Sequence, residues 1–276
     1  MDERDGMVRL LRQHARTVRL LGVESMGVDF LPLAREGAVV MDDAGAVGRA
    51  GGAGARGMGK DGAIAVDEAP AAAGRIAPAG GGDKVGGSKT EMLAELRERY
   101  EREATVPRMI EGWNRIVFSD GSADAELMFI GEAPGADEDA QGVPFVGRAG
   151  QKLTEMIIAM GLSRESVYIA NVLKVRPPGN RTPTPEEAAL DGPYLVEQIR
   201  IVRPRVIVTL GLPAARFLLN SMESMGSLRG CWHEFEGIPV MPTYHPAYLL
   251  RAYTPENRKK VWSDLQMAMG RLRAEG

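Results

Sequence analysis

The asparagine at position 171 is the first side chain in this sequence whose setting suggests chemistry. Asn171 ends a run of β-favouring residues, so we expect its amide to be buried. A buried amide must pair both its donor and its acceptor, and reading the edge of a heterocyclic base makes the same demand. Lys174, Arg176 and Arg181 follow it and form a basic patch, which is either a solvated loop or a site for a negatively charged ligand.

A lone histidine is more often structural than catalytic, but His245 has a setting that favours function. It follows an apolar run, and residues 249–251 then supply two leucines and an arginine in the manner of an apolar wedge. His14 and His233 have no such setting. His245 is therefore the candidate imidazole of this sequence.

Residues 131–150 form a glycine-rich loop that permits close approach of backbone to a ligand. Its spacing matches neither a dinucleotide-binding fingerprint nor a Walker loop. Asp137, Glu138 and Asp139 crowd it with negative charge, which a phosphate-binding loop would avoid. Phe145 lies within it and is either a core plug or a platform on which a ring could stack.

Strands alternate with helices around these loops. We expect strands at residues 127–130, 167–172, 206–210 and 238–241, with helical periodicity at 153–160, 195–202 and 261–272. This alternation predicts an α/β fold, a three-layer αβα sandwich with a central, mostly parallel four-stranded sheet. Ligands of such sheets bind beyond the carboxyl ends of the strands, where the loops above would converge.

Three regions divide the chain. Residues 1–36 include an amphipathic helix at 5–24, which docks on this or another protein or presents its arginines to DNA. Residues 37–89 are rich in Gly and Ala and predict a disordered linker. We expect residues 90–276 to form the folded α/β domain, which opens with a charged helical segment at 91–103.

Composition narrows the function classes. The 276 residues carry 34 Lys and Arg against 37 Asp and Glu, a net charge of -3 that neither requires nor excludes nucleic acid. Cys231 is the single cysteine, which excludes an intramolecular disulfide, an iron–sulfur cluster with cysteine ligands and a multi-cysteine zinc site. No apolar run approaches the roughly 20 residues that cross a bilayer. We expect a cytoplasmic monomer without a metal or other cofactor.

Four motifs in order and spacing resemble the family 4 uracil-DNA glycosylases over about residues 127–265. They are Gly131-Glu132-Ala133-Pro134-Gly135 with Glu138-Asp139, Pro144-Phe145-Val146-Gly147 with Ala149-Gly150, Asn171 with Arg176-Pro177-Pro178-Gly179-Asn180-Arg181, and Thr243-Tyr244-His245-Pro246 with Leu249-Leu250-Arg251. Any one of these motifs alone would be a weak signal. The resemblance implies the uracil-DNA glycosylase fold and release of free uracil from DNA, leaving an abasic site.

The resemblance also implies roles for residues of the pocket. Phe145 would stack on a uracil flipped out of single- or double-stranded DNA, and Ala133 would contact that base. Asn171 would accept from N3–H and donate to O4, while His245 would donate to O2, where negative charge develops. The matched pocket residues include no lysine, which implies an enzyme without lyase activity.

A carboxylate would orient water or stabilise the sugar cation, and Glu132 and Glu138 both remain candidates for that role. The family's DNA-contacting positions correspond to Arg176, Arg181, Leu249, Leu250 and Arg251. Two alternatives stay open: a non-catalytic DNA-binding or adaptor derivative, and a glycosylase for another deaminated base, hypoxanthine or xanthine.

Family members hold a 4Fe–4S cluster through four cysteines, and this sequence lacks all four. Val175 and Asp191 stand where two of them are expected, and residues 102–107 contain neither of the others. Loss of the whole set predicts a cluster-free protein. We expect apolar packing by Val106, Met109, Trp113 and Val175 to replace the cluster as a tether.

Overall fold

The computed structural model describes residues 87–274. The predicted N-terminal helix at 5–24 and nearly all of the predicted linker at 37–89 lie outside the described residues. Helix α2 (Lys89–Glu103) contains the predicted charged helical segment at 91–103, and the Ser88 side chain caps its first turn. Within the described range, no helix has the length and apolar content that crossing a bilayer requires.

Four parallel strands form the centre of one sheet, as the sequence predicts. They are ordered β3 (Tyr168–Asn171), β2 (Leu127–Gly131), β4 (Val206–Leu210) and β6 (Ile238–Thr243). β2 pairs in parallel with both β3 and β4, and β4 pairs in parallel with β6. β2, β3 and β4 are buried along their whole length, which is why they read as continuous apolar runs.

The prediction of four strands was incomplete, because the sheet has six. β1 (Asp120–Gly121) and β5 (His233–Phe235) add antiparallel edges beside β3 and β6. These strands are only two and three residues long and are partly exposed. Neither has the apolar run or alternation that predicts a strand from sequence.

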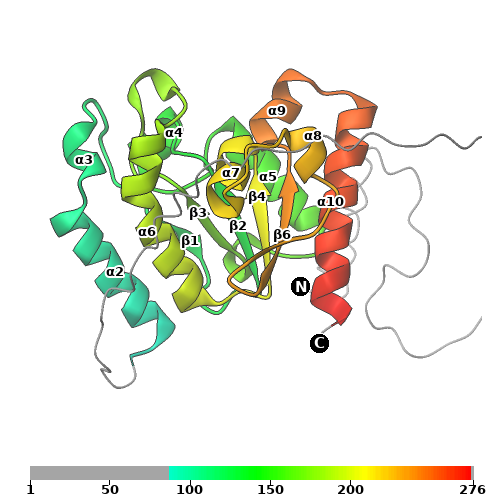
Figure 1. Ribbon diagram of the computed structural model, residues 1–276, viewed down its shortest axis with the longest axis horizontal. Coiled ribbons are helices and arrows are strands. Elements are labelled where there is room, and N and C mark those ends of the chain that lie inside the picture. The colour runs from blue at the N-terminus through cyan, green and yellow to red at the C-terminus, as the bar shows by residue number, and fades with distance from the viewer. Residues whose placement is uncertain (1–86, 275–276) are drawn as a thin grey trace, which may run out of the picture. The chain divides into compact units, whose positions relative to one another are not determined.

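Helices cover both faces of the sheet and make three layers. The remaining helices are α3 (Val106–Met109), α4 (Ala136–Gln141), α5 (Arg148–Ala159), α6 (Pro185–Val202), α7 (Leu212–Leu219), α8 (Met225–Leu228), α9 (Pro246–Arg251) and α10 (Pro255–Ala274), with short 3-10 turns η2 (Arg164–Ser166) and η3 (Pro178–Asn180). Figure 1 shows α2 beside α6 on one side of the sheet and α10 on the other. The three predicted helical segments lie in α5, α6 and α10.

Candidate active site

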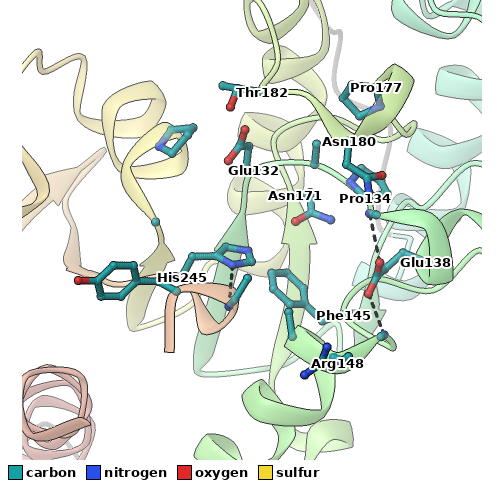
Figure 2. Close-up of a pocket in the computed structure, with 18 of the residues that line it drawn as sticks. Glu132, Pro134, Glu138, Phe145, Arg148, Asn171, Pro177, Asn180, Thr182 and His245 are labelled. Carbon is teal, nitrogen blue, oxygen red and sulfur yellow. Dashed lines mark hydrogen bonds between the residues drawn. The ribbon is translucent and has the colours of Figure 1, made fainter. Parts of the chain in front are cut away.

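The loops that follow the four parallel strands line one cavity of about 790 Å³ at the carboxyl edge of the sheet. Asn171 ends β3, Glu132 follows β2, and His245 follows β6. Figure 2 shows these three side chains and Phe145 turned toward the same space. The sequence motifs therefore converge as the fold class predicts.

Asn171 lines this cavity and carries a buried amide oxygen. The residue is only 2% exposed, and within the described part of the chain its Oδ1 atom has no hydrogen-bond partner. A Cβ atom placed on Gly131 would lie 2.3 Å from Oδ1 and 2.5 Å from Cζ of Phe145. Only glycine at position 131 leaves room for both side chains.

His245 stands across the cavity from Asn171 with a defined proton position. The backbone N–H of Ala247 donates to Nδ1 over 3.1 Å, so a neutral ring carries its proton on Nε2 as a free donor. The ring lies 5.6 Å from that of Phe145, centroid to centroid. Burial, with a smaller contribution from the Arg251 cation, lowers the pKa of His245 to about 4.

The two candidate carboxylates have different surroundings. Glu138 accepts from the backbone N–H groups of Val146 (3.0 Å) and Gly147 (2.9 Å) through one oxygen, and from that of Gly135 through the other. Figure 2 shows it turned toward this loop. Glu132 lines the cavity, and burial raises its pKa, partly offset by a hydrogen bond to the Thr182 side chain. Glu132 is thus the carboxylate with capacity left for a ligand.

The predicted basic patch loses Lys174, whereas Arg176 and Arg181 keep part of their side chains accessible. Lys174 is fully buried and donates to the backbone oxygen of Asn171 (2.6 Å) and to Oε1 of Gln198 (2.5 Å). Arg176 is held by Asn180, while Arg181 lines the cavity and binds Glu187 at the start of α6. The prediction failed for Lys174 because its neighbours in space, from α6, are distant in sequence.

The predicted apolar wedge is also corrected in part. Leu249 is fully buried, because the short helix α9 packs on α5 and turns this side chain inward. Leu250 is half-buried, and Arg251 is exposed at the cavity rim. Of the three predicted residues, only Leu250 and Arg251 are accessible to DNA in this conformation.

Several cavity residues were not predicted from the sequence. The cavity is lined by four side chains that the sequence did not single out as site residues: Asp137, Arg148, Thr182 and Tyr248. Ala133, which was predicted, also lines it. Gly211 has a φ of +95°, and a Cβ there would lie 3.1 Å from that of His245. A glycine directly after an apolar strand was the available signal for Gly211, whereas the others have ordinary loop or helix settings.

The low pKa of His245 predicts a ring that stays neutral in the folded protein at pH 5 and above. Ring-proton chemical shifts followed by NMR, assigned with His245→Gln, should stay constant from pH 8 to about 5. The unfolded chain takes up this proton near pH 6.5, so His245 lowers stability progressively as the pH falls below that value. A titration midpoint near 6.5 in the folded protein would contradict the effect of burial on His245 described above.

Comparison with known proteins gives the same family as the motifs. Residues 118–266 match the uracil DNA glycosylase superfamily. A type-4 uracil-DNA glycosylase of Thermotoga maritima is 42% identical over 191 residues, which cover 68% of this chain and 99% of the relative. A type-4 uracil-DNA glycosylase of Archaeoglobus fulgidus is 48% identical over 154 residues, 53% of this chain and 76% of the relative.

A more distant relative is a uracil-DNA glycosylase of another type. A type-5 uracil-DNA glycosylase of Pyrobaculum aerophilum is 32% identical over 157 residues, 50% of this chain and 68% of the relative. The type-4 relatives are more similar and include one that is matched along almost its whole length. By its cavity, its motifs and these similarities, the chain belongs to the type-4 uracil-DNA glycosylases of the uracil-DNA glycosylase superfamily.

Proposed function

We propose that this chain hydrolyses the N-glycosidic bond of uracil in DNA and reads the flipped base through Asn171. The observation that carries the proposal is the buried Oδ1 acceptor of Asn171, which has no partner within the described residues and belongs to a side chain that lines the cavity. A buried acceptor left open is costly unless a ligand donates to it. Uracil N3–H is such a donor.

Base selection follows from the fixed amide. Uracil donates at N3 and accepts at O4, which matches the Oδ1 acceptor and the Nδ2 donor of Asn171. Cytosine reverses both groups, so its binding would leave two buried polar pairs unmade. Phe145, 6% exposed, supplies the aromatic face against which the base stacks.

Bond cleavage leaves negative charge on the uracil ring, and the imidazole of His245 stabilises it. Because Ala247 occupies Nδ1, the Nε2–H group donates to O2 of the departing base. The pKa near 4 keeps the ring neutral at physiological pH, so it acts as a hydrogen-bond donor and not as a cation.

Glu132 is the carboxylate that we assign to the sugar and the attacking water. Both carboxylates line the cavity, but both oxygens of Glu138 already bind backbone N–H groups. Glu138 therefore acts through the shape of the loop that carries Phe145. We assign the contacts to DNA beyond the flipped base to Arg181 and Arg251, which line the cavity, and to Leu250. Arg176 does not line the cavity and is assigned a more distant contact.

A duplex oligonucleotide with one uracil tests the activity. Incubation with the chain followed by alkali should break the strand at that position, and free uracil should appear in equal amount. Matched duplexes with cytosine, thymine or hypoxanthine should stay intact. DNA binding without uracil release would instead support the non-catalytic derivative, and cleavage confined to hypoxanthine would support another deaminated base as the substrate.

Asn171→Asp tests the reading of the base edge. The carboxylate keeps an acceptor but loses the donor to O4, so kcat/KM for uracil should fall roughly 10- to 100-fold, with a smaller preference over cytosine. Asn220→Asp, at the C-terminal end of α7, is the matched control and should keep wild-type kinetics. Equal activity of the two variants would remove Asn171 from base recognition.

We further propose that the chain works without the iron–sulfur cluster implied by its family resemblance. Its single cysteine, Cys231, is exposed, and the described residues contain no group of three or more His, Cys, Asp or Glu that could hold a metal. At the expected cysteine positions, Val175 is buried in apolar core and Asp191 accepts from Tyr100 Oη over 2.9 Å. These residues do not fit a cluster.

A buried polar network occupies this region. The Asp191 oxygen that binds Tyr100 of α2 also accepts from the backbone N–H of Lys174 over 3.0 Å. Burial lowers the pKa of the Lys174 ammonium and raises that of the Asp191 carboxyl, and their mutual attraction opposes both shifts. The network thus connects α2, α6 and the end of β3.

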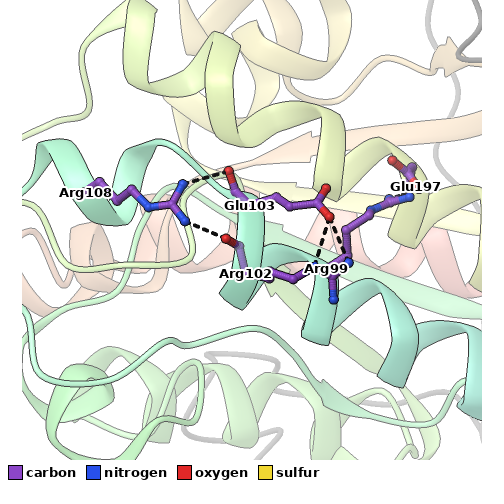
Figure 3. Close-up of polar contacts among 5 residues, drawn as sticks. All are labelled: Arg99, Arg102, Glu103, Arg108 and Glu197. Atoms are coloured by element: carbon purple, nitrogen blue, oxygen red, sulfur yellow. Dashed lines mark hydrogen bonds and ion pairs between the residues drawn. The ribbon is translucent and has the colours of Figure 1, made fainter.

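Other contacts tether the segment between α2 and α3. Val106, Trp113 and Val175 pack in one core cluster, as expected, but Met109 is 46% exposed, so its predicted role was wrong. Figure 3 shows Arg108 donating to the backbone oxygens of Arg102 and Glu103, with Arg99 of α2 paired to Glu197 of α6. Together these contacts hold the segment between α2 and α3 against α6 and the core.

Purified protein tests the cluster-free proposal directly. It should be colourless, contain only trace iron and keep its uracil release after treatment with a chelator. Cys231→Ser should behave identically. A brown protein with stoichiometric iron that the Cys231→Ser variant loses would contradict the cluster-free proposal. The assignment of uracil as the substrate would be unaffected.

Monomeric state, cytoplasmic location and a protein partner for the N-terminal region remain predictions from the sequence. They do not bear on the pocket, whose walls all come from residues 132–251.

A further inference from the structure

We propose that Arg164 is a positioning residue that fixes the Phe145 ring for stacking on the flipped base. The inference rests on the proposed function, because it assigns Phe145 the stacking role. Arg164 lies in the short 3-10 turn η2, between α5 and β3. The sequence motifs do not include it.

Phe145 needs such support because its backbone is in an unfavourable conformation. Its φ of +53° lies in the left-handed region, which a bulky side chain with a Cβ rarely adopts. Residues held there cost free energy and persist only where their surroundings fix them. Without outside contacts, this peptide would relax and move the ring.

Arg164 supplies contacts on the carbonyl side of the loop. One guanidinium nitrogen donates to the backbone oxygen of Phe145 over 3.0 Å, and the other terminal nitrogen donates to the backbone oxygen of Pro144. A planar guanidinium holds two neighbouring acceptors in fixed relative positions, which a lysine ammonium does not. The two peptide groups on either side of the Phe145 N–Cα bond are thus set together.

Asp120 anchors the guanidinium in turn. Its carboxylate accepts from Nε of Arg164 over 2.6 Å, and the pair is largely shielded from solvent. Asp120 lies in β1, opposite Ile169 of β3, two residues before Asn171. Through Asp120, the position of the Phe145 ring is therefore linked to β3, the strand that carries Asn171.

The opposite side of the loop is already fixed. Glu138 accepts from the backbone N–H groups of Val146 and Gly147, and the start of α5 lies so close that a Cβ on Gly150 would be 1.8 Å from the Phe145 oxygen. Glu138 binds the donors of this loop, and Arg164 binds its acceptors. Removal of Arg164 leaves the left-handed residue held from one side only.

Amide hydrogen exchange tests the positioning without substrate. In Arg164→Met, exchange of the amides at residues 145–147 should be faster than in the wild type, and Arg164→Lys should restore only part of the protection. Arg200→Met is the matched control, because Arg200 also binds a carboxylate, Glu236, away from the cavity. Exchange in Arg164→Met equal to that of the control would overturn the proposal.

Kinetics on the uracil duplex then show whether this order serves the base. Stacking acts on the bound base before and during cleavage, so Arg164→Met should raise KM roughly tenfold and change kcat by less than about twofold. Asp120→Asn should shift KM in the same direction by less. An unchanged KM overturns the role of Arg164 in base binding. A wild-type chain that releases no uracil overturns the proposed function instead, and the exchange measurement then decides by itself whether Arg164 positions Phe145.

Discussion

An amide oxygen at the end of a buried strand, unpaired among residues 87–274, is the constraint around which this site is organised. Leaving such an oxygen unsatisfied costs about 1–3 kcal/mol, and Asn171 is kept in that state from several directions. The parallel ladder pairs it with Gly131, whose missing side chain leaves space for Oδ1. Lys174 donates to its backbone oxygen from behind. The acceptor is thereby held open for the base contact that we propose.

The other walls of the cavity are prepared in the same manner. The N–H of Ala247 fixes the tautomer of His245, and burial keeps the ring neutral. Backbone donors and acceptors on both sides of Phe145 are bound by Glu138 and Arg164. Groups that need no reorganisation when charge develops are the most effective at stabilising it. The ring of His245 and the backbone around Phe145 are therefore each fixed by hydrogen bonds to neighbouring groups of the protein.

The contacts that hold α2 against the domain are connected to the backbone of Asn171. Tyr100 of α2 binds Asp191 of α6, which binds the backbone of Lys174, whose ammonium reaches the carbonyl of Asn171. Both of these bonds to Asp191 go to Oδ2, and its other oxygen, Oδ1, is buried without a hydrogen-bond partner among the described residues. This chain of contacts links α2 and α6 to the strand that ends at Asn171.

By itself the sequence determined the four central strands, the helices with strong apolar periodicity, and the loops that hold Glu132, Phe145, Asn171 and His245, because strand and helix periods are local properties. It also excluded cysteine ligation by composition. Only the tertiary structure decided that Lys174 and Leu249 are buried, that Glu138 serves its loop, and that Arg164 reaches Phe145. The physical reason is that burial and pairing depend on neighbours from distant segments, which no local pattern records.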